Sequence, residues 1–304
     1  RMKKRRLILE DGSVYEGIAF GADNYRMGEL IFQTGMSGYQ EIISDLSYYG
    51  QIVMMTYPAM GNCGINRDDF ESISPMVFGF VVKEYCEEPS NFRSDMTLDA
   101  FMKLKGIPGI ADIDTREITR KIRDHGTLKA IMADEDANVE EVVAMLKNSE
   151  LPHDGVQQVS TQKPFPIPSR GAKVVMVDIG TKFAVIREFN MRGCDLVVVP
   201  YNMSAEDILA IHPDGVVFSG GPGAPEAIAT CKALLGKLPM LGIGLGHEVI
   251  ACACGAKVVK MKVGHHGNSS PVRNLKKNKI EFTAQNHGYE IAEDSLAETG
   301  LIVP

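Results

Sequence analysis

Apolar residues in the first half of the chain come in short runs that are typical of strands. Three such runs lie at residues 29–33, 51–56 and 76–82. Residues 7–14 contain two more, separated by Asp11-Gly12, which is a favourable hairpin turn. The glycine-punctuated residues 34–48 predict a short helix at most, and the basic residues 1–6 predict a solvated tail.

Two helices are clearly indicated in the same half. Asp114 is a good N-cap, and Glu117 three residues later gives a capping-box arrangement. Ile118 and Ile122 then share one face, and Gly126 ends the run. The second helix has apolar residues at i, i+3, i+4 and i+7, namely Val139, Val142, Val143 and Leu146. Strands with interspersed helices predict a mixed α/β domain.

The pattern changes after a segment that contains three prolines and no periodicity, residues 155–170, which is predicted to be a linker. Buried strands are then predicted at residues 173–177, 195–199 and 215–218. Helices are predicted between them, at residues 182–191 and 205–211 with Ser204 as the cap of the second, and a further helix runs through Leu235. Strands that alternate with helices predict a parallel sheet with right-handed crossovers.

Composition narrows the class of protein. The 304 residues are 44% hydrophobic and 23% charged, which is ordinary for a globular protein, and the length suggests two domains. The formal net charge of −7 gives no support for nucleic-acid binding. No apolar run approaches the roughly 20 residues of a membrane span. Six cysteines without CxxC spacing, and no visible signal peptide, predict reduced thiols and a cytoplasmic location.

The most informative stretch is residues 241–254, which predict a strand, a sharp turn and a helix. The apolar residues 237–240 precede it, and Gly255 ends the helix. Three glycines between Gly242 and Gly246 mean that the backbone bends tightly, and a helix N-terminus offers free N–H groups to an oxyanion. Taken alone, such a turn could equally be a plain connection between a strand and a helix.

Two further stretches strengthen the functional interpretation. Residues 219–225 follow a strand, so this glycine-rich turn should lie at the same sheet edge as the turn after residue 241. Residues 283–289 follow the strand-like residues 279–282 and offer an amide, an imidazole and a tight turn. Backbone N–H groups in the two glycine turns would suit a tetrahedral oxyanion.

The turn after residue 241 resembles the nucleophile elbow of the triad glutamine amidotransferases. The pattern in that family reads G-I-C-L-G-H-Q, whereas this chain reads G-I-G-L-G-H-E. The position of the attacking thiol is therefore Gly244, and that of a glutamine-binding Gln is Glu248. The order of the three stretches, together with the first half, is similar to the small chain of carbamoyl-phosphate synthetase. The first half contributes to the match through residues 9–12, 34–48, 56–58, 90–93 and 113–116.

This resemblance implies a domain order and a fold class. A carbamoyl-phosphate synthetase small-chain domain of mixed α/β structure is expected at residues 1–154. A linker is expected at 155–171, and an open parallel-sheet class I amidotransferase domain at 172–304. The family's base and its orienting acid come from a His-Pro-Glu motif beyond the asparagine turn. That motif is absent here, so the second domain is expected to be truncated at its C-terminus. His212-Pro213-Asp214 precedes the elbow and is not a substitute.

The resemblance also implies an activity and a partner. The family's small chain hydrolyses glutamine to glutamate through a cysteine thioester, and the ammonia reaches a large subunit that makes carbamoyl phosphate for pyrimidine and arginine synthesis. We therefore expect a cytoplasmic heterodimer with the large subunit, L-glutamine as ligand, and no nucleic acid or membrane. No cofactor is expected in this chain, because ATP and magnesium belong to the large subunit.

Residue roles follow from the same resemblance. The oxyanion donors would be the N–H groups of Leu245 and Gly221. Beside Glu248, glutamine would be bound by residues matching Ser47, Gly221, Gly223, Leu245, Asn286, Gly288 and Tyr289. No metal is expected, because the adjacent His265 and His266 do not have the spacing of metal ligands.

Gly244 leaves one alternative open. A thioester requires a thiolate, and glycine has no side chain. Cys252 cannot replace it, because eight residues of helix span about 12 Å at roughly 1.5 Å per residue. The chain could therefore be a catalytically inactive structural subunit of an ammonia-using synthetase.

Overall fold

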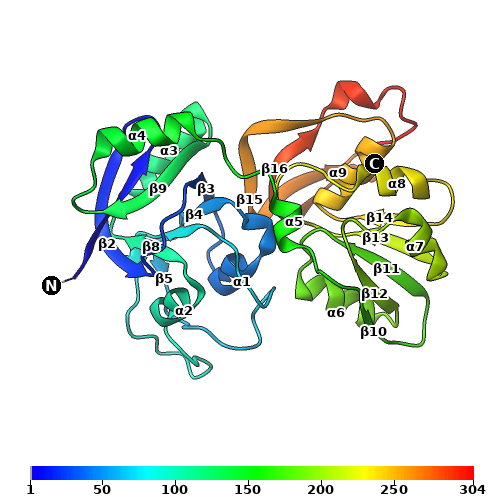
Figure 1. The fold of residues 1–304 in the computed structure, drawn as a ribbon, viewed down its shortest axis with the longest axis horizontal. Coiled ribbons are helices and arrows are strands. Elements are labelled where there is room, and N and C mark those ends of the chain that lie inside the picture. The colour runs from blue at the N-terminus through cyan, green and yellow to red at the C-terminus, as the bar shows by residue number, and fades with distance from the viewer. Residues whose placement is uncertain (1) are drawn as a thin grey trace. The chain divides into compact units, whose positions relative to one another are not determined.

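The computed structural model describes residues 2–304, and these form two compact units. The first unit comprises the chain up to Pro152 together with Lys262–Ser270, and the second comprises His153–Met261 and Pro271–Pro304 (Figure 1). No helix among residues 2–304 is both long enough and apolar enough to cross a membrane.

The first unit is built on a closed β-barrel. Its strands follow one another around the barrel in the order β1 (Lys4–Leu9), β2 (Val14–Gly21), β8 (Pro108–Ala111), β6 (Gly79–Val81), β4 (Gln51–Met55), β3 (Gly28–Gln33) and β9 (Leu128–Asp134). The predicted hairpin is confirmed, since β1 and β2 pair antiparallel and Gly12 in the turn has a φ of 91°. The barrel therefore contains all four strand regions that the sequence predicts in this half.

Short helices and a small ladder complete the first unit. They are α1 (Tyr39–Ser44), the 3₁₀ turn η1 (Leu46–Tyr48), α2 (Leu98–Lys105), α3 (Thr115–His125), α4 (Val139–Asn148), and the paired strands β5 (Ala59–Met60) and β7 (Glu84–Tyr85). The start of α3 is as predicted, because Asp114 Oδ1 accepts a hydrogen bond of 2.9 Å from the Glu117 N–H. Ile118 and Ile122 on α3 are fully buried.

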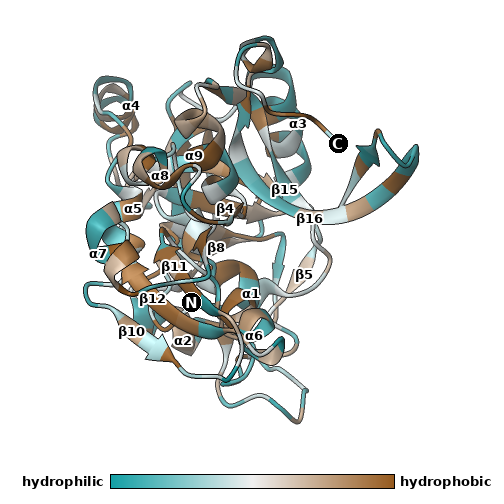
Figure 2. Cartoon of the chain, turned by 90° about the vertical axis from the view of Figure 1, so that its right-hand side faces the viewer, coloured by the Kyte–Doolittle hydropathy of each residue, from teal (hydrophilic) through white to brown (hydrophobic). Residues whose placement is uncertain are grey.

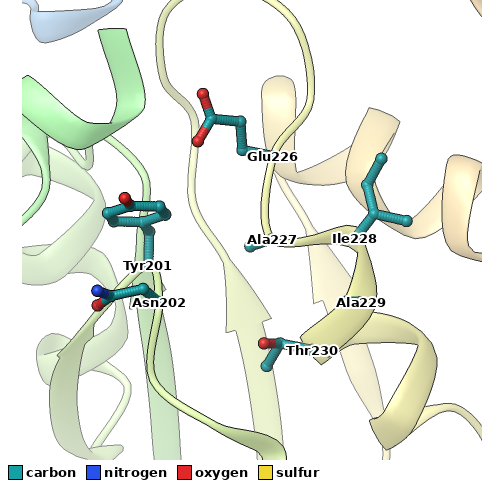
Figure 3. A pocket seen from close by; sticks show the side chains of 7 residues that line it. All are labelled: Tyr201, Asn202, Glu226, Ala227, Ile228, Ala229 and Thr230. Atoms are coloured by element: carbon teal, nitrogen blue, oxygen red, sulfur yellow. The ribbon is translucent and has the colours of Figure 1, made fainter. Parts of the chain in front are cut away.

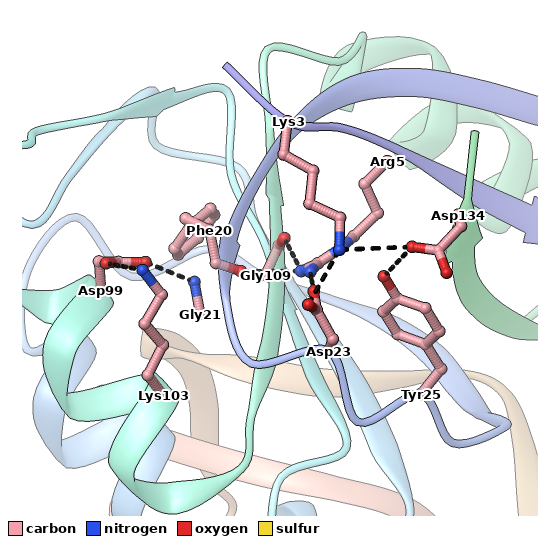
Figure 4. A network of polar contacts seen from close by, with 10 residues as sticks. All are labelled: Lys3, Arg5, Phe20, Gly21, Asp23, Tyr25, Asp99, Lys103, Gly109 and Asp134. Atoms are coloured by element: carbon pink, nitrogen blue, oxygen red, sulfur yellow. Dashed lines mark hydrogen bonds and ion pairs between the residues drawn. The ribbon is translucent and has the colours of Figure 1, made fainter. Parts of the chain in front are cut away.

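Residues 4–6 of the basic start are not a solvated tail but part of a strand, and Arg1 lies outside the described residues. Strand β1 begins at Lys4, and Arg5 is only 1% exposed. The Arg5 guanidinium donates to the carbonyl oxygens of Phe20 (2.8 Å) and Gly109 (2.6 Å) and to Asp23 (2.5 Å), as Figure 4 shows. These acceptors lie on other parts of the chain and satisfy the two terminal nitrogens of the buried cation, whereas its Nε has no hydrogen-bond partner in the described chain. The sequence pattern alone could not reveal them.

The second unit is an open five-stranded sheet with layers on both faces. The strand order is β10 (Phe165–Ile167), β12 (Asp195–Pro200), β11 (Lys173–Asp178), β13 (Gly215–Phe218) and β14 (Met240–Gly242), and all neighbours except β10 and β12 are parallel. The helices are α5 (Gly155–Val159), α6 (Phe183–Met191), α7 (Ala205–Ala210), α8 (Ile228–Leu234) and α9 (Leu245–Ala253). The predicted parallel sheet is confirmed.

Successive apolar side chains of β11 pack alternately against the helices on the two faces of the sheet. Val175 and Val177 belong to the apolar cluster that includes residues of α7, α8 and α9. Val174 and Met176 belong to a second cluster, against which residues of α6 pack. Successive residues of a strand point to opposite faces, so an uninterrupted apolar strand is buried on both sides. Figure 2 shows β11 and β12 in the brown of hydrophobic residues.

Two stretches differ from the sequence prediction. The proline-rich stretch predicted as a linker contains α5 and β10, and Pro166 of β10 pairs with the edge of β12. Proline is compatible with an edge strand because its missing N–H can face away from the ladder. Residues 283–289 form no tight turn but lie within β16 (Lys279–Ile291), which forms a two-stranded sheet with β15 (Val258–Asn274). The short 3₁₀ turn η2 (Glu293–Leu296) follows.

Candidate active site

The predicted elbow is present between β14 and α9. Gly244 has φ 54° and ψ −118°, a backbone conformation that residues with a side chain rarely adopt. A Cβ built at this position would meet only the Gly220 Cα, at 3.6 Å, which is an ordinary contact. The position therefore has room for a side chain, and its cost would come from the backbone conformation. A catalytic role for residue 244 remains a prediction.

Two other glycines allow the start of α9 to pack tightly. The Gly246 N–H donates to the Ser219 carbonyl at 2.9 Å, and a Cβ on Gly246 would lie 2.0 Å from the Phe218 oxygen. A Cβ on Gly242 would lie 2.5 Å from the Gly246 oxygen. Because neither position accepts a side chain, the glycines bring the N-terminus of α9 against the carboxyl ends of β13 and β14.

The glycine-rich loop after β13 lies beside this turn. A Cβ on Gly221 would meet the Ile179 oxygen at 1.8 Å and Cδ2 of Leu245 at 3.3 Å, so Gly221 and Leu245 are neighbours. No hydrogen bond from either N–H is found among residues 2–304. Both N–H groups are thus without an acceptor in the described chain, and their role as oxyanion donors remains a prediction. Gly223 has a φ of 73°, and a Cβ there would meet no atom within 4 Å.

Glu248 places a buried carboxyl group at the elbow. It lies one helical turn after Gly244, is 6% exposed, and its carboxyl has no hydrogen-bond or ion-pair partner among the described residues. Burial raises the pKa of this carboxyl to about 7. Near neutral pH, the carboxyl is therefore divided between an acceptor-only carboxylate and a neutral acid that can donate.

The asparagine stretch lies close to α9. Asn286, Gly288 and Tyr289 lie on β16, which contacts α9. The His287 ring is held by its Nδ1 near the Tyr289 oxygen (2.7 Å) and by its Nε2 near the Gln285 side-chain oxygen (2.9 Å). Burial, and to a smaller extent the charge of His287, lower the pKa of His247. The second unit thus brings most of the predicted glutamine-binding positions to one region.

Three other residues considered in the sequence, Ser47, Cys252 and His266, have no established role in this site. Ser47 lies in η1 of the first unit, where its N–H donates to Asp45 Oδ1 at 2.9 Å, and its role in glutamine binding remains a prediction. Cys252 on α9 is half-buried, and burial followed by the charge of Glu248 raises the pKa of its thiol. Within the described chain, no group of three or more His, Cys, Asp or Glu side chains could hold a metal, and His266 is buried in the first unit.

One residue at this sheet edge was missed by the sequence analysis. Asp178 ends β11, is 6% exposed, and accepts N–H hydrogen bonds from Thr161 (2.8 Å), Gly180 (3.0 Å) and Thr181 (2.9 Å). Burial raises the pKa of its carboxyl, and these three donors oppose that effect. An acidic residue that directly follows a buried apolar strand was the available signal.

Comparison with known proteins covers both units. The model of the carbamoyl-phosphate synthase small chain, CPSase domain, matches residues 7–132, and the model of class-I glutamine amidotransferases matches residues 175–303. The carbamoyl phosphate synthase small chain of Oceanobacillus iheyensis is 53% identical over 99% of this chain and 83% of its own length. The chain belongs to the carbamoyl-phosphate synthase small-chain family.

A second relative supports the same assignment. The carbamoyl phosphate synthase pyrimidine-specific small chain of Bacillus subtilis is 53% identical over 97% of this chain and 82% of its own length. Membership in the carbamoyl-phosphate synthase small-chain family confirms the predicted resemblance and the predicted fold class, with a small-chain domain followed by a class-I amidotransferase domain.

Proposed function

We propose that this chain is the small subunit of a carbamoyl-phosphate synthase of the glutamine-dependent family, and that, with glycine at residue 244, it binds glutamine at the elbow before α9 without hydrolysing it. The observation that carries the proposal is that Gly221 and Leu245, whose N–H groups have no acceptor in the described chain, are neighbours beside a residue held in the elbow conformation. The similarity of the whole chain to small chains, one of them named pyrimidine-specific, supports it.

Hydrolysis of glutamine requires a thiol at residue 244, whereas binding of glutamine does not. In the family's route, a thiolate attacks the side-chain amide carbon of glutamine, a C–S bond forms, and ammonia leaves after protonation. Water then attacks the thioester, which releases glutamate and restores the thiol. The N–H groups of Leu245 and Gly221 would stabilise the oxyanion in both steps. Gly244 provides no sulfur, so neither C–S bond formation nor thioester hydrolysis can occur at this residue.

The second candidate function follows from Gly244. In this alternative, the chain stabilises a large subunit that uses free ammonia, and it contributes structure rather than catalysis. ATP and magnesium would be bound by the large subunit in both cases, and the chain itself would need no cofactor.

The experiment combines the purified chain with a carbamoyl-phosphate synthase large chain and measures carbamoyl phosphate synthesis with glutamine and with ammonium chloride. We expect synthesis from ammonia only, together with glutamine binding in calorimetry. Glutamine-dependent turnover at the level of a cysteine-containing small chain would contradict the assignment of residue 244. Absence of glutamine binding would favour the purely structural alternative.

A further inference from the structure

A cavity lies in the second unit, and Gly244 is not among the residues that line it. It measures about 420 Å³ and lies between the end of β12, with Tyr201 and Asn202, and the start of α8, with Ile228 and Thr230 (Figure 3). Glu226 precedes α8 and also lines the cavity. Cavities of a few hundred Å³ are of the size that holds small organic molecules.

Several polar groups in this cavity lack internal partners. The Tyr201 hydroxyl, the Asn202 amide and the Glu226 carboxyl make no side-chain hydrogen bond among residues 2–304. Thr230 Oγ1 donates to the Met203 carbonyl at 3.2 Å and retains the capacity to accept. Figure 3 shows the Glu226 carboxyl directed across the cavity towards the side on which Tyr201 lies. A few unpartnered polar groups on an otherwise apolar wall are typical of a ligand site.

The charge of the cavity selects for a cation. No Lys, Arg or His lines it, and Glu226 has no ion-pair partner in the described chain. Burial, and then the neighbouring charge of Asp154, raise the pKa of Glu226. A ligand cation beside this carboxylate would offset both effects, whereas an anion would add to the repulsion. The face of the Tyr201 ring could add a cation–π contact.

The size and the apolar wall restrict the kind of cation. A bare ammonium or metal ion would occupy only a small part of 420 Å³. The Ala227 methyl and the Tyr201 ring line the cavity and offer contacts to a hydrocarbon chain and none to a hydrated ion, whereas the Ile228 side chain points away from Tyr201 and packs against the core (Figure 3). We propose that this cavity binds a small organic ammonium ion, with its charged group at Glu226 and its aliphatic body against Ala227 and the Tyr201 ring.

The test measures binding of n-butylammonium to the whole chain by calorimetry and by ligand-observed NMR. Three probes isolate the recognised features: 1-butanol lacks the charge, butyrate reverses it, and ammonium chloride lacks the aliphatic body. We expect n-butylammonium to bind with a dissociation constant of roughly 1 mM, corresponding to about −4 kcal/mol, and each other probe to bind at least fivefold more weakly.

Two matched variants assign the site. Glu226→Gln removes the charge with little change in shape, and it should weaken n-butylammonium binding at least fivefold. Glu206→Gln removes an exposed acid on α7 and should leave binding unchanged. Butanol binding as tightly as the amine, equal binding by Glu226→Gln, or no detectable amine binding would each overturn the proposal. Glutamine binding at the elbow is measured separately, so the two proposals can fail independently.

Discussion

Gly244 combines an unusual backbone conformation with free space around its missing side chain. Its φ of 54° and ψ of −118° should cost a residue with a side chain about 1–3 kcal/mol. Replacing glycine also reduces the entropy of the unfolded chain, which returns roughly 0.4–1 kcal/mol. Because the strain is larger, we expect Gly244→Ala and Gly244→Cys each to lower the free energy of unfolding by about 1 kcal/mol in urea denaturation.

Gly288 provides the matched control for this comparison. A Cβ at Gly288 would meet no atom within 4 Å, so there is room for it as there is at Gly244, but the backbone there is not in the left-handed region. Gly288→Ala should therefore be neutral or slightly stabilising. If Gly244→Ala and Gly244→Cys raised the unfolding midpoint as well, residue 244 would not be strained and the elbow would be misplaced.

Glu248 should weaken glutamine binding. Its carboxylate cannot donate a hydrogen bond as the family's amide can, and it places a negative charge near the ligand's own carboxylate. Because its pKa is raised to about 7, the affinity of the chain for glutamine should fall as the pH rises from 6 to 8. Glu248→Gln should bind glutamine more tightly at pH 8 and lose this pH dependence in calorimetry. Equal affinities of the two proteins at pH 8 would contradict the assignment.

The same carboxyl should make the stability of the chain depend on pH. Burial raises its folded-state pKa from 4.5 to about 7, so the protonated form is favoured in the folded state. Its contribution is fully present below about 4.5 and is lost as the pH rises through 7. Relative to Glu248→Gln, the native chain should lose on the order of 3 kcal/mol of unfolding free energy between these limits. Parallel denaturation curves of the two proteins at pH 4.5 and 8 measure it, and a constant difference would argue against a buried carboxyl.

Single residues show where sequence reasoning succeeds and where it stops. Gly244 and Glu248 could be identified because they interrupt a recognisable local pattern, and the structure places both at the start of α9. Arg5 could not be assigned its role, because its burial depends on acceptors that include the carbonyl of Gly109, 104 positions away. Local pattern carries no information about such contacts.

At the scale of elements, the junction between β13, β14 and α9 depends on glycine. A Cβ at Gly246 would lie 2.0 Å from the Phe218 oxygen, which is backbone and cannot rotate away. Gly246→Ala should therefore force the N-terminus of α9 away from the sheet and lower the unfolding free energy by more than about 2 kcal/mol. Chemical denaturation measures this loss. A smaller effect than that of Gly244→Ala would show that α9 does not pack as closely as described.

Elements with strong local signals were predicted well. Helix α3 begins after its Asp114 cap and ends at Gly126, and the strands of the second sheet lie close to the predicted apolar runs. The prediction was wrong for two strands, β10 and β16, whose structure depends on pairing with another strand. Strand β10 forms because an edge of β12 is available, and β16 continues through residues that look turn-like because it pairs with β15.

At the scale of the whole molecule, the order of elements is readable from the sequence but the closure of the barrel is not. The sequence predicts strands in the first half, yet the pairing of β2 with β8 joins residues about ninety positions apart. Such non-local pairing has no local signature. In the second half, regular alternation of strands and helices restricts the topology, so a parallel sheet could be predicted correctly.

The last prediction concerns assembly with a large subunit through the first unit. Ile73 and Leu104 expose 77% and 71% of their surface there, and Lys105 next to Leu104 donates to the Ile73 carbonyl at 3.1 Å, so these apolar side chains belong to one surface region. We take this exposed apolar pair as the candidate contact surface for the large subunit. We expect the chain to co-elute with a carbamoyl-phosphate synthase large chain in size-exclusion chromatography at micromolar concentration.

The double variant Ile73→Ser, Leu104→Ser should weaken this association at least tenfold, or about 1.4 kcal/mol. Met191→Ser, which alters a 78% exposed side chain on α6 of the second unit, should leave it unchanged. Separate elution of the native chain would refute the pairing itself. Equal affinity of the double variant would exclude this surface of the first unit from the interface.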